Sequence, residues 1–139
     1  MSYKIISKFI KDISFEIPNT KAFVMLEKEI ANYALNFDIK SNSYKKNIIE
    51  VNPTLKISPN ENVKHKILTE ITCTTLVSIE KNFEDKKELE KIILIKIPTE
   101  IFPLLYETFV YLFKQAGIKN IQIEKTVDFQ KLYDKRKNN

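Results

Sequence analysis

The chain has 139 residues, of which 43% are hydrophobic and 29% are charged, with a formal net charge of +5. This length fits one domain over residues 1–139 with its own core, and the composition is too apolar for a disordered protein. No apolar run reaches the roughly 18 residues of a membrane span, and Lys4, Lys8 and Lys11 interrupt any signal-peptide core. A single cysteine excludes an internal disulfide and fits a reducing compartment, so we expect a cytoplasmic protein.

The positive charge is a weak indication of nucleic-acid binding. Arg136 is the only arginine among 23 basic residues, and arginine is the side chain suited to bidentate phosphate and base recognition. Gly117 is the only glycine, so the chain has no glycine-rich loop that could cradle a phosphate. A nucleic-acid-binding module and a small-molecule enzyme therefore remain as rival interpretations that the sequence does not favour.

Four segments alternate apolar and polar residues with period two, the pattern of half-buried strands. They cover residues 9–17, 33–40, 48–58 and 63–79. Polar, turn-forming links predict that the second to fourth strands form an antiparallel meander. The residues expected to face inward in the first strand are Phe9, Ile13, Phe15 and Ile17.

Two features interrupt this pattern. Pro53 lies inside the third strand and predicts an edge position or a bulge, because proline cannot donate to the ladder. The link between the first two strands, residues 18–32, is longer than a hairpin needs. It carries Phe23, Val24 and Met25, so it is either a packed crossover or an exposed apolar loop.

The C-terminal half of the chain favours helices. Residues 84–92 predict a short connecting helix, and a 3.6-residue apolar period predicts a long helix from Thr99 to Gly117. Pro103 is tolerable only near the N-terminal end of that helix, and Gly117 is a natural terminator. A short helix is expected from Asp128 to about Lys135.

The long helix is apolar around nearly its whole circumference. Beyond the stripe that one sheet can cover, it carries Phe102, Tyr106, Val110 and Tyr111. The remaining predicted helix is too short to cover them all, so we expect a partner subunit to do so.

Residues for catalysis or metal binding are few. His65 is the only histidine and is expected to be structural, and Cys73 is expected to be a buried, inert thiol. No cluster of cysteine and histidine predicts a metal site or a cofactor. Asp12 and Glu16 share the polar face of the first strand, about 13 Å apart at about 3.3 Å per residue. This separation is too long for a catalytic pair and suits the docking of a basic peptide.

The polar face of the fourth strand contains one apolar residue, Leu68, beside Glu70. Two interpretations stay open. Leu68 is either an isolated surface leucine, which is common, or a small apolar contact at the centre of a protein-binding patch.

Three segments resemble the SecB family of protein-export chaperones. "KDISFEIPN" (11–19) resembles the family's Lys-Asp-Ile-Ser-Phe-Glu-x-Pro-Asn run in the first strand. "PTEIFPLLYE" (98–107) is similar to its Pro-x-x-x-Phe-Pro-x-x-x-Glu segment, and "VDFQKLY" (127–133) to its C-terminal Val-x-Phe-x-x-Leu-aromatic helix. The matches keep their order and span nearly the whole chain.

The resemblance implies an α+β fold, a four-stranded antiparallel sheet with a long and a short C-terminal helix on one face. It also implies a homotetramer, a dimer of dimers with the long helices at its centre, and no enzymatic activity. Family members hold unfolded precursor proteins and pass them to SecA, the ATPase motor of the translocase. By resemblance, the residues that bind the zinc-bearing, lysine-rich tail of SecA are Asp12, Glu16, Leu68 and Glu70. The zinc belongs to the partner.

Client binding requires apolar grooves that accept extended hydrophobic segments. The residues that could line them are Phe23, Val24, Met25, Leu35, Phe37, Ile39, Phe129, Leu132 and Tyr133. Each could instead belong to the core. The family is usually acidic whereas this chain is basic, which should disfavour basic client segments. An alternative is a SecB-like chaperone dedicated to one client, such as an antitoxin, which would not need the residues of a SecA dock.

Overall fold

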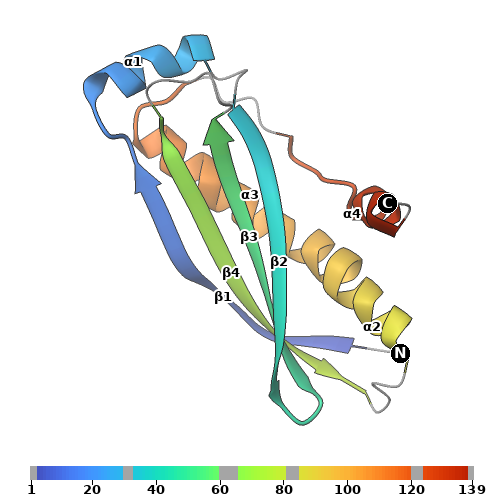
Figure 1. Ribbon diagram of the computed structural model, residues 1–139. Coiled ribbons are helices and arrows are strands. Elements are labelled where there is room, and N and C mark those ends of the chain that lie inside the picture. Colours follow the sequence, from blue (N-terminus) through green and yellow to red (C-terminus); the bar gives the residue numbers. More distant parts are fainter. Residues whose placement is uncertain (1–2, 30–32, 60–65, 81–84, 120–123, 138–139) are drawn as a thin grey trace.

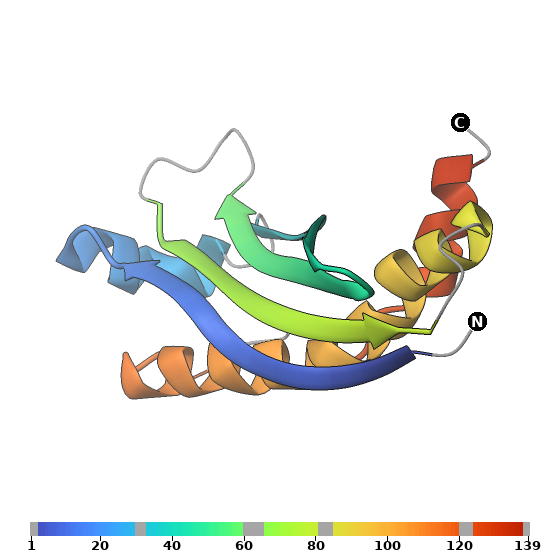
Figure 2. The same cartoon turned by 90° about the horizontal axis from the view of Figure 1, so that it is seen from below.

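The computed structural model describes residues 3–29, 33–59, 66–80, 85–119 and 124–137 of the chain (Figure 1). A four-stranded sheet carries α3 along one face, while α1 lies at one end of the sheet and α4 lies near the opposite end of α3 (Figures 1 and 2). The strands are β1 (Tyr3–Glu16), β2 (Tyr33–Lys45), β3 (Ile48–Pro59) and β4 (Leu68–Ile79). The helices are α1 (Thr20–Glu29), α2 (Lys86–Lys91), the π-helix η2 (Ile92–Lys96), α3 (Ile97–Gln115) and α4 (Phe129–Lys137).

The strand order is β1-β4-β3-β2, and every neighbouring pair is antiparallel. This confirms the predicted α+β fold class and the meander of the second to fourth strands. Asn47 has a φ of 64° in the turn between β2 and β3, a conformation that asparagine tolerates. The predicted start of the fourth strand, with Val63 and His65, lies outside the described residues.

Two β-bulges in β1 change which of its side chains face the helices. The register shifts between Ile5 and Ser7 and again between Ile10 and Asp12. A bulge inserts one residue and reverses the alternation, so Ile10 lies opposite the buried Cys73 and packs against the core. Phe9 falls on the other face and is 49% exposed. The prediction that Phe9 faces inward was therefore wrong.

Pro53 does not lie at an edge. β3 has β2 on one side and β4 on the other. The register of β3 on β4 is the same before and after the proline, but the pairing skips from Val51–Thr75 to Thr54–Thr72. The missing N–H thus interrupts the ladder inside the sheet, without an edge or a bulge.

The helices α2, η2 and α3 follow one another without a break from Lys86 to Gln115, so the predicted gap between two separate helices was wrong. The N–H of Ile97 bonds to the carbonyl of Ile92, five residues earlier, which is the π-type spacing. Pro98 follows directly and has no N–H, and a local widening beside a proline is a common way for a helix to continue. Pro103 consequently lies inside the continuous helix instead of near its start.

The predicted terminator of the long helix is confirmed. α3 ends at Gln115 with Ala116 as its C-cap, and Gly117 has a φ of +92°, where a side chain would be strained. The N–H of Ile118 returns to the carbonyl of Phe113 at 3.0 Å, closing the end of the helix.

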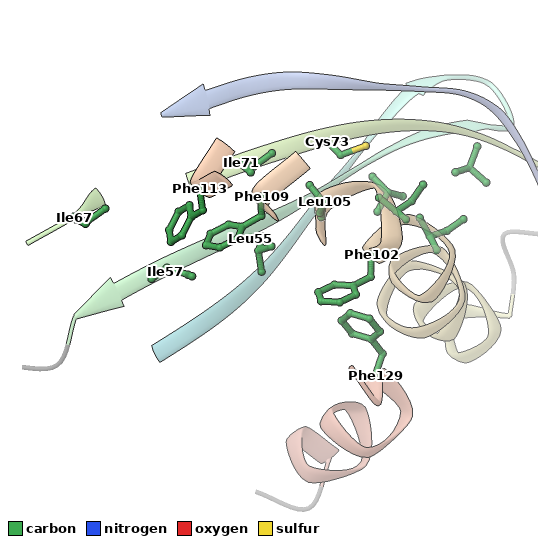
Figure 3. Close-up of a cluster of buried hydrophobic side chains, with 14 of the residues drawn as sticks. Leu55, Ile57, Ile67, Ile71, Cys73, Phe102, Leu105, Phe109, Phe113 and Phe129 are labelled. Atoms are coloured by element: carbon green, nitrogen blue, oxygen red, sulfur yellow. The ribbon is translucent and has the colours of Figure 1, made fainter. Parts of the chain in front are cut away.

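The core lies between α3 and one face of the sheet, the inner face (Figure 3). The rings of Phe15 in β1 and Phe113 in α3 pack edge to face with their centres 5.4 Å apart. The centres of the Phe113 and Phe109 rings are 4.1 Å apart. Such aromatic pairs add to the free energy gained from burying apolar area. The buried residues of α3 are Ile97, Pro98, Ile101, Phe102, Leu105, Phe109 and Phe113.

Candidate functional site

The two strands β1 and β4 bring together the four residues that the sequence predicted as a docking patch. The register places Glu16 opposite Leu68, Ser14 opposite Glu70 and Asp12 opposite Thr72. Residues that lie opposite each other in an antiparallel pair point to the same face, and alternate residues share it. Asp12, Glu16, Leu68 and Glu70 therefore lie together on the outer face of the sheet, away from α3. We call these four residues the outer patch.

The outer patch is accessible to a partner. Asp12 and Glu16 are exposed, Glu70 is half-buried and Leu68 is 48% exposed. Among the residues that the structure describes, none of the three carboxylates makes an ion pair within 4 Å. An exposed leucine flanked by carboxylates that make no close ion pair can bind a basic chain that also carries an apolar group.

Beside the outer patch lies a shallow polar depression of about 550 Å³ over the middle of the same face, which sequence analysis did not identify. The Thr54 and Thr72 hydroxyls bond to each other at 2.9 Å, and the Thr74 hydroxyl donates to the Asn52 side chain at 2.7 Å. Side-chain bonds between neighbouring strands fix these polar groups in place. A pattern that could have predicted this depression was present in the sequence, because the even positions of β2 and β3 are almost all polar.

The residues predicted to bind apolar client segments divide into a buried, an exposed and a half-buried group. Phe129 and Tyr133 of α4 are 3% and 4% exposed, and Phe37 packs against Phe129 at 4.8 Å. Val24 and Leu132 are 60% and 49% exposed. The half-buried residues, which present one side to the surface, are Met25, Leu35, Phe37 and Ile39.

The crossover between β1 and β2 contains a helix, α1, that packs on one side only. Ala22 and Leu26 are buried, and the ring of Phe23 reaches to 3.5 Å from the place where Gly117 would carry a Cβ. Phe23 itself remains 36% exposed, next to the exposed Val24. The two interpretations of this link are thus both partly right, since it is a packed crossover with an exposed apolar side.

Phe102 is covered within the chain, contrary to the prediction that a partner must cover it. Its ring lies 6.0 Å from Phe37 and 6.0 Å from Phe129, and Figure 3 shows it facing Phe129 across the space between α3 and α4. Tyr111 is 62% exposed, and Tyr106 and Val110 are partly exposed. These last three residues form the uncovered side of α3, beside a cavity of about 460 Å³.

A groove follows the inner side of β2 from Phe37 to Lys45. It consists of three adjoining cavities of about 240, 340 and 510 Å³. The first two share Ile39 and Leu94, and the last two share Leu89 and Ile93, so the cavities adjoin one another in a row. We call this feature the β2 groove. Its walls come from β2, β3, α2, η2 and α4.

The reactive groups that sequence analysis singled out offer little chemistry. Cys73 is buried, as predicted, and burial raises the pKa of its thiol above the ordinary 9.0, with smaller opposing effects from Thr75, Phe9 and Lys8. His65 lies outside the described residues. In the part of the chain that the structure describes, acidic, cysteine and histidine side chains form no cluster of three that could hold a metal ion. None of the helices among these residues is both long and apolar enough to cross a membrane.

Comparisons with known proteins agree with this architecture. The family model "SecB: Preprotein translocase subunit SecB" matches residues 1–139. A protein of Pelagibacter ubique, provisionally named protein-export protein SecB, is 42% identical over 99% of this chain and 98% of its own. The protein-export protein SecB of Anaplasma phagocytophilum is 26% identical over 93% of this chain and 89% of its own.

Among solved structures, the fold is similar to the Rv1957 SecB-like chaperone of Mycobacterium tuberculosis, which was solved with a peptide from the HigA1 antitoxin. The TM-score is 0.67 and the identity 13%, over 90% of this chain and 88% of the other. A Streptococcus agalactiae protein of unknown function has a TM-score of 0.54 at 10% identity, over 89% of this chain and 98% of its own. At these identities the similarity concerns the fold alone.

Proposed function

The chain belongs to the SecB family and is a protein-export chaperone, and we propose that it holds precursor proteins unfolded in the cytoplasm and delivers them to SecA. The family is not an enzyme family. The observation that carries the delivery step is the outer patch. Four residues that are far apart in sequence, Asp12 and Glu16 against Leu68 and Glu70, meet on one exposed surface.

The outer patch suits the zinc-bearing, lysine-rich tail of SecA. Its carboxylates attract a basic tail over a distance and align it with the strands, which mainly raises the rate of association. Leu68 adds apolar burial beside Glu16 and Glu70, and apolar groups that exclude water contribute to affinity. The dedicated-chaperone alternative needs no such patch, so the patch supports export as the function.

Client proteins would bind where apolar groups reach the surface. The β2 groove offers Phe37 and Ile39 beside the exposed Leu132, and α1 offers Phe23 and Val24 at the other end of the sheet. Binding at several such places at once gives affinity without sequence specificity. Phe129 and Tyr133 act mainly by holding α4 in position, because they are buried within the chain.

The proposed homotetramer would cover the surfaces that the single chain leaves apolar. The uncovered side of α3 supports a contact between helices of different subunits. β1 is an edge strand with Ile6, Phe9 and Ile13 about half exposed, so a second subunit could also pair with it. The uncovered side of α3 lies on the other side of the sheet from the outer patch, whereas β1 itself carries Asp12 and Glu16 of that patch.

A titration against the SecA C-terminal tail tests the proposal. We expect the Asp12→Ala/Glu70→Ala variant to bind at least tenfold more weakly than the wild type, about 1.4 kcal/mol. The control is Glu80→Ala/Glu124→Ala, which removes two exposed carboxylates outside the outer patch and outside the cavities described above, and it should bind within about twofold of the wild type. Equal loss in both variants would indicate a general charge effect, and no loss in either would contradict the assignment of the dock.

A further inference from the structure

The β2 groove has an apolar floor and a basic rim. Its apolar lining includes Ile39, Leu89, Ile93 and Leu94. The cations that line it are Lys45, Lys46, Lys86 and Arg136, and the acids are Asp38 and Glu90. The rim therefore carries two more positive than negative charges.

The basic side chains of the rim are not neutralised from within the chain. All four are exposed, and in the described residues none of them makes an ion pair within 4 Å. The Nζ atom of Lys45 lies 5.4 Å from the centre of the Tyr44 ring. These cations can consequently interact with charges on a bound molecule.

The dimensions of the groove match an extended peptide. The stretch of β2 from Phe37 to Lys45 spans about 26 Å at about 3.3 Å per residue. An extended segment of about eight residues fits along it, with its ends near Arg136 at one end and near Lys45 and Lys46 at the other.

We propose that the β2 groove selects extended apolar client segments that have acidic residues on their flanks. This inference rests on the proposed chaperone function and specifies its clients. The apolar floor accepts the hydrophobic side chains, and the rim cations attract carboxylates beside them. Segments with basic flanks meet a like-charged rim and are disfavoured.

The test uses labelled peptides that share one eight-residue apolar core and carry three Glu, three Ser or three Lys residues on each flank. Fluorescence anisotropy with the full chain should give an affinity for the Glu-flanked peptide about tenfold above that of the Lys-flanked peptide in 0.1 M NaCl. The difference should shrink towards 0.5 M NaCl, because the rim charges are exposed and screened by salt.

Variants separate the rim from the overall charge. Lys86→Gln/Arg136→Gln should weaken binding of the Glu-flanked peptide about three- to tenfold and leave the Ser-flanked peptide within twofold. Lys56→Gln/Lys66→Gln removes the same charge from exposed positions outside the groove and should change both affinities less than twofold.

Equal affinities for the Glu- and Lys-flanked peptides, or equal losses in the two variants, would overturn the inference. A parallel assay measures whether the chain suppresses aggregation of an unfolded precursor. It distinguishes failure of the inference about the β2 groove from failure of the proposed function. If no peptide binds but aggregation is suppressed, the inference about the β2 groove is wrong and the chaperone function stands. If neither occurs, the proposed holding of precursors fails as well.

Discussion

At the scale of single residues, Leu68 and Leu55 illustrate the two sides of the sheet. Leu55 is fully buried on the inner face, whereas Leu68 is 48% exposed on the outer face. Leu55→Ala should lower the free energy of unfolding by about 2–5 kcal/mol because it leaves a cavity. Leu68→Ala should change it by less than about 0.5 kcal/mol and still weaken binding of the SecA tail. Denaturant unfolding measures the two free energies, and the titration with the SecA tail measures binding. A strongly destabilised Leu68→Ala variant would contradict an outward-facing side chain.

The thiol of Cys73 gives a second prediction at this scale. Burial raises its pKa above the ordinary 9.0, so the unfolded chain loses this proton at a lower pH than the folded chain does. The resulting contribution to stability is complete below about pH 9 and falls as the pH rises further.

Burial of Cys73 also predicts slow chemical labelling. A thiol reagent should modify the native chain about 100-fold or more slowly than the unfolded chain, because the thiol is reached only through opening of the fold. Rapid stoichiometric labelling of the native chain would contradict this, and Cys73→Ala should lack any labelling.

At the scale of elements, α4 is held by its aromatic contacts. Phe129 is 3% exposed and packs against Phe37 and Phe102, whereas the outward side of α4 is polar. A helix of nine residues is not stable alone and depends on such packing. Phe129→Ala should release α4 and open one wall of the β2 groove.

Hydrogen exchange measures this release. Amides of residues 129–137 should lose protection in Phe129→Ala, while those of β3 and β4 keep theirs. Gln130→Ala, a substitution on the exposed side of α4 that removes only a bond to Asp134, is the control and should leave the exchange of both regions unchanged. Unchanged protection of α4 in Phe129→Ala would show that other contacts hold it.

At the scale of the whole molecule, the uncovered side of α3 leads us to expect that several chains associate in solution. Tyr111, at 62% exposure, and the partly exposed Val110 and Tyr106 are apolar side chains of α3 that a single chain leaves in contact with water. Light scattering of the wild type should give a mass of about four times 16.4 kDa. Tyr111→Glu should reduce that mass and leave the circular dichroism of the chain unchanged, because the side chain is 62% exposed in the single subunit. Gln130→Glu makes the same change of charge elsewhere and should preserve the wild-type mass; a monomeric wild type would contradict the prediction.

Much of the fold follows from local patterns in the sequence. Period-two alternation identified the strands, and polar, turn-forming links identified the antiparallel order of the second to fourth strands. The 3.6-residue period and Gly117 identified the long helix and its end. These features depend on near neighbours along the chain, which is why they can be predicted. The position of Phe9 could not be predicted, because it depends on a bulge whose place is set by pairing with β4.

For the site, the sequence by itself determined which residue types are available, including the acidic row of Asp12 and Glu16 and the Leu68–Glu70 pair. Only the tertiary structure decided that these two rows are adjacent, because the strand order places β4 beside β1 although β2 and β3 lie between them in sequence. The same is true of the β2 groove, because its walls come from elements that are far apart in the sequence. Adjacency of distant segments is fixed by burial of the shared inner face, a property of the folded chain as a whole.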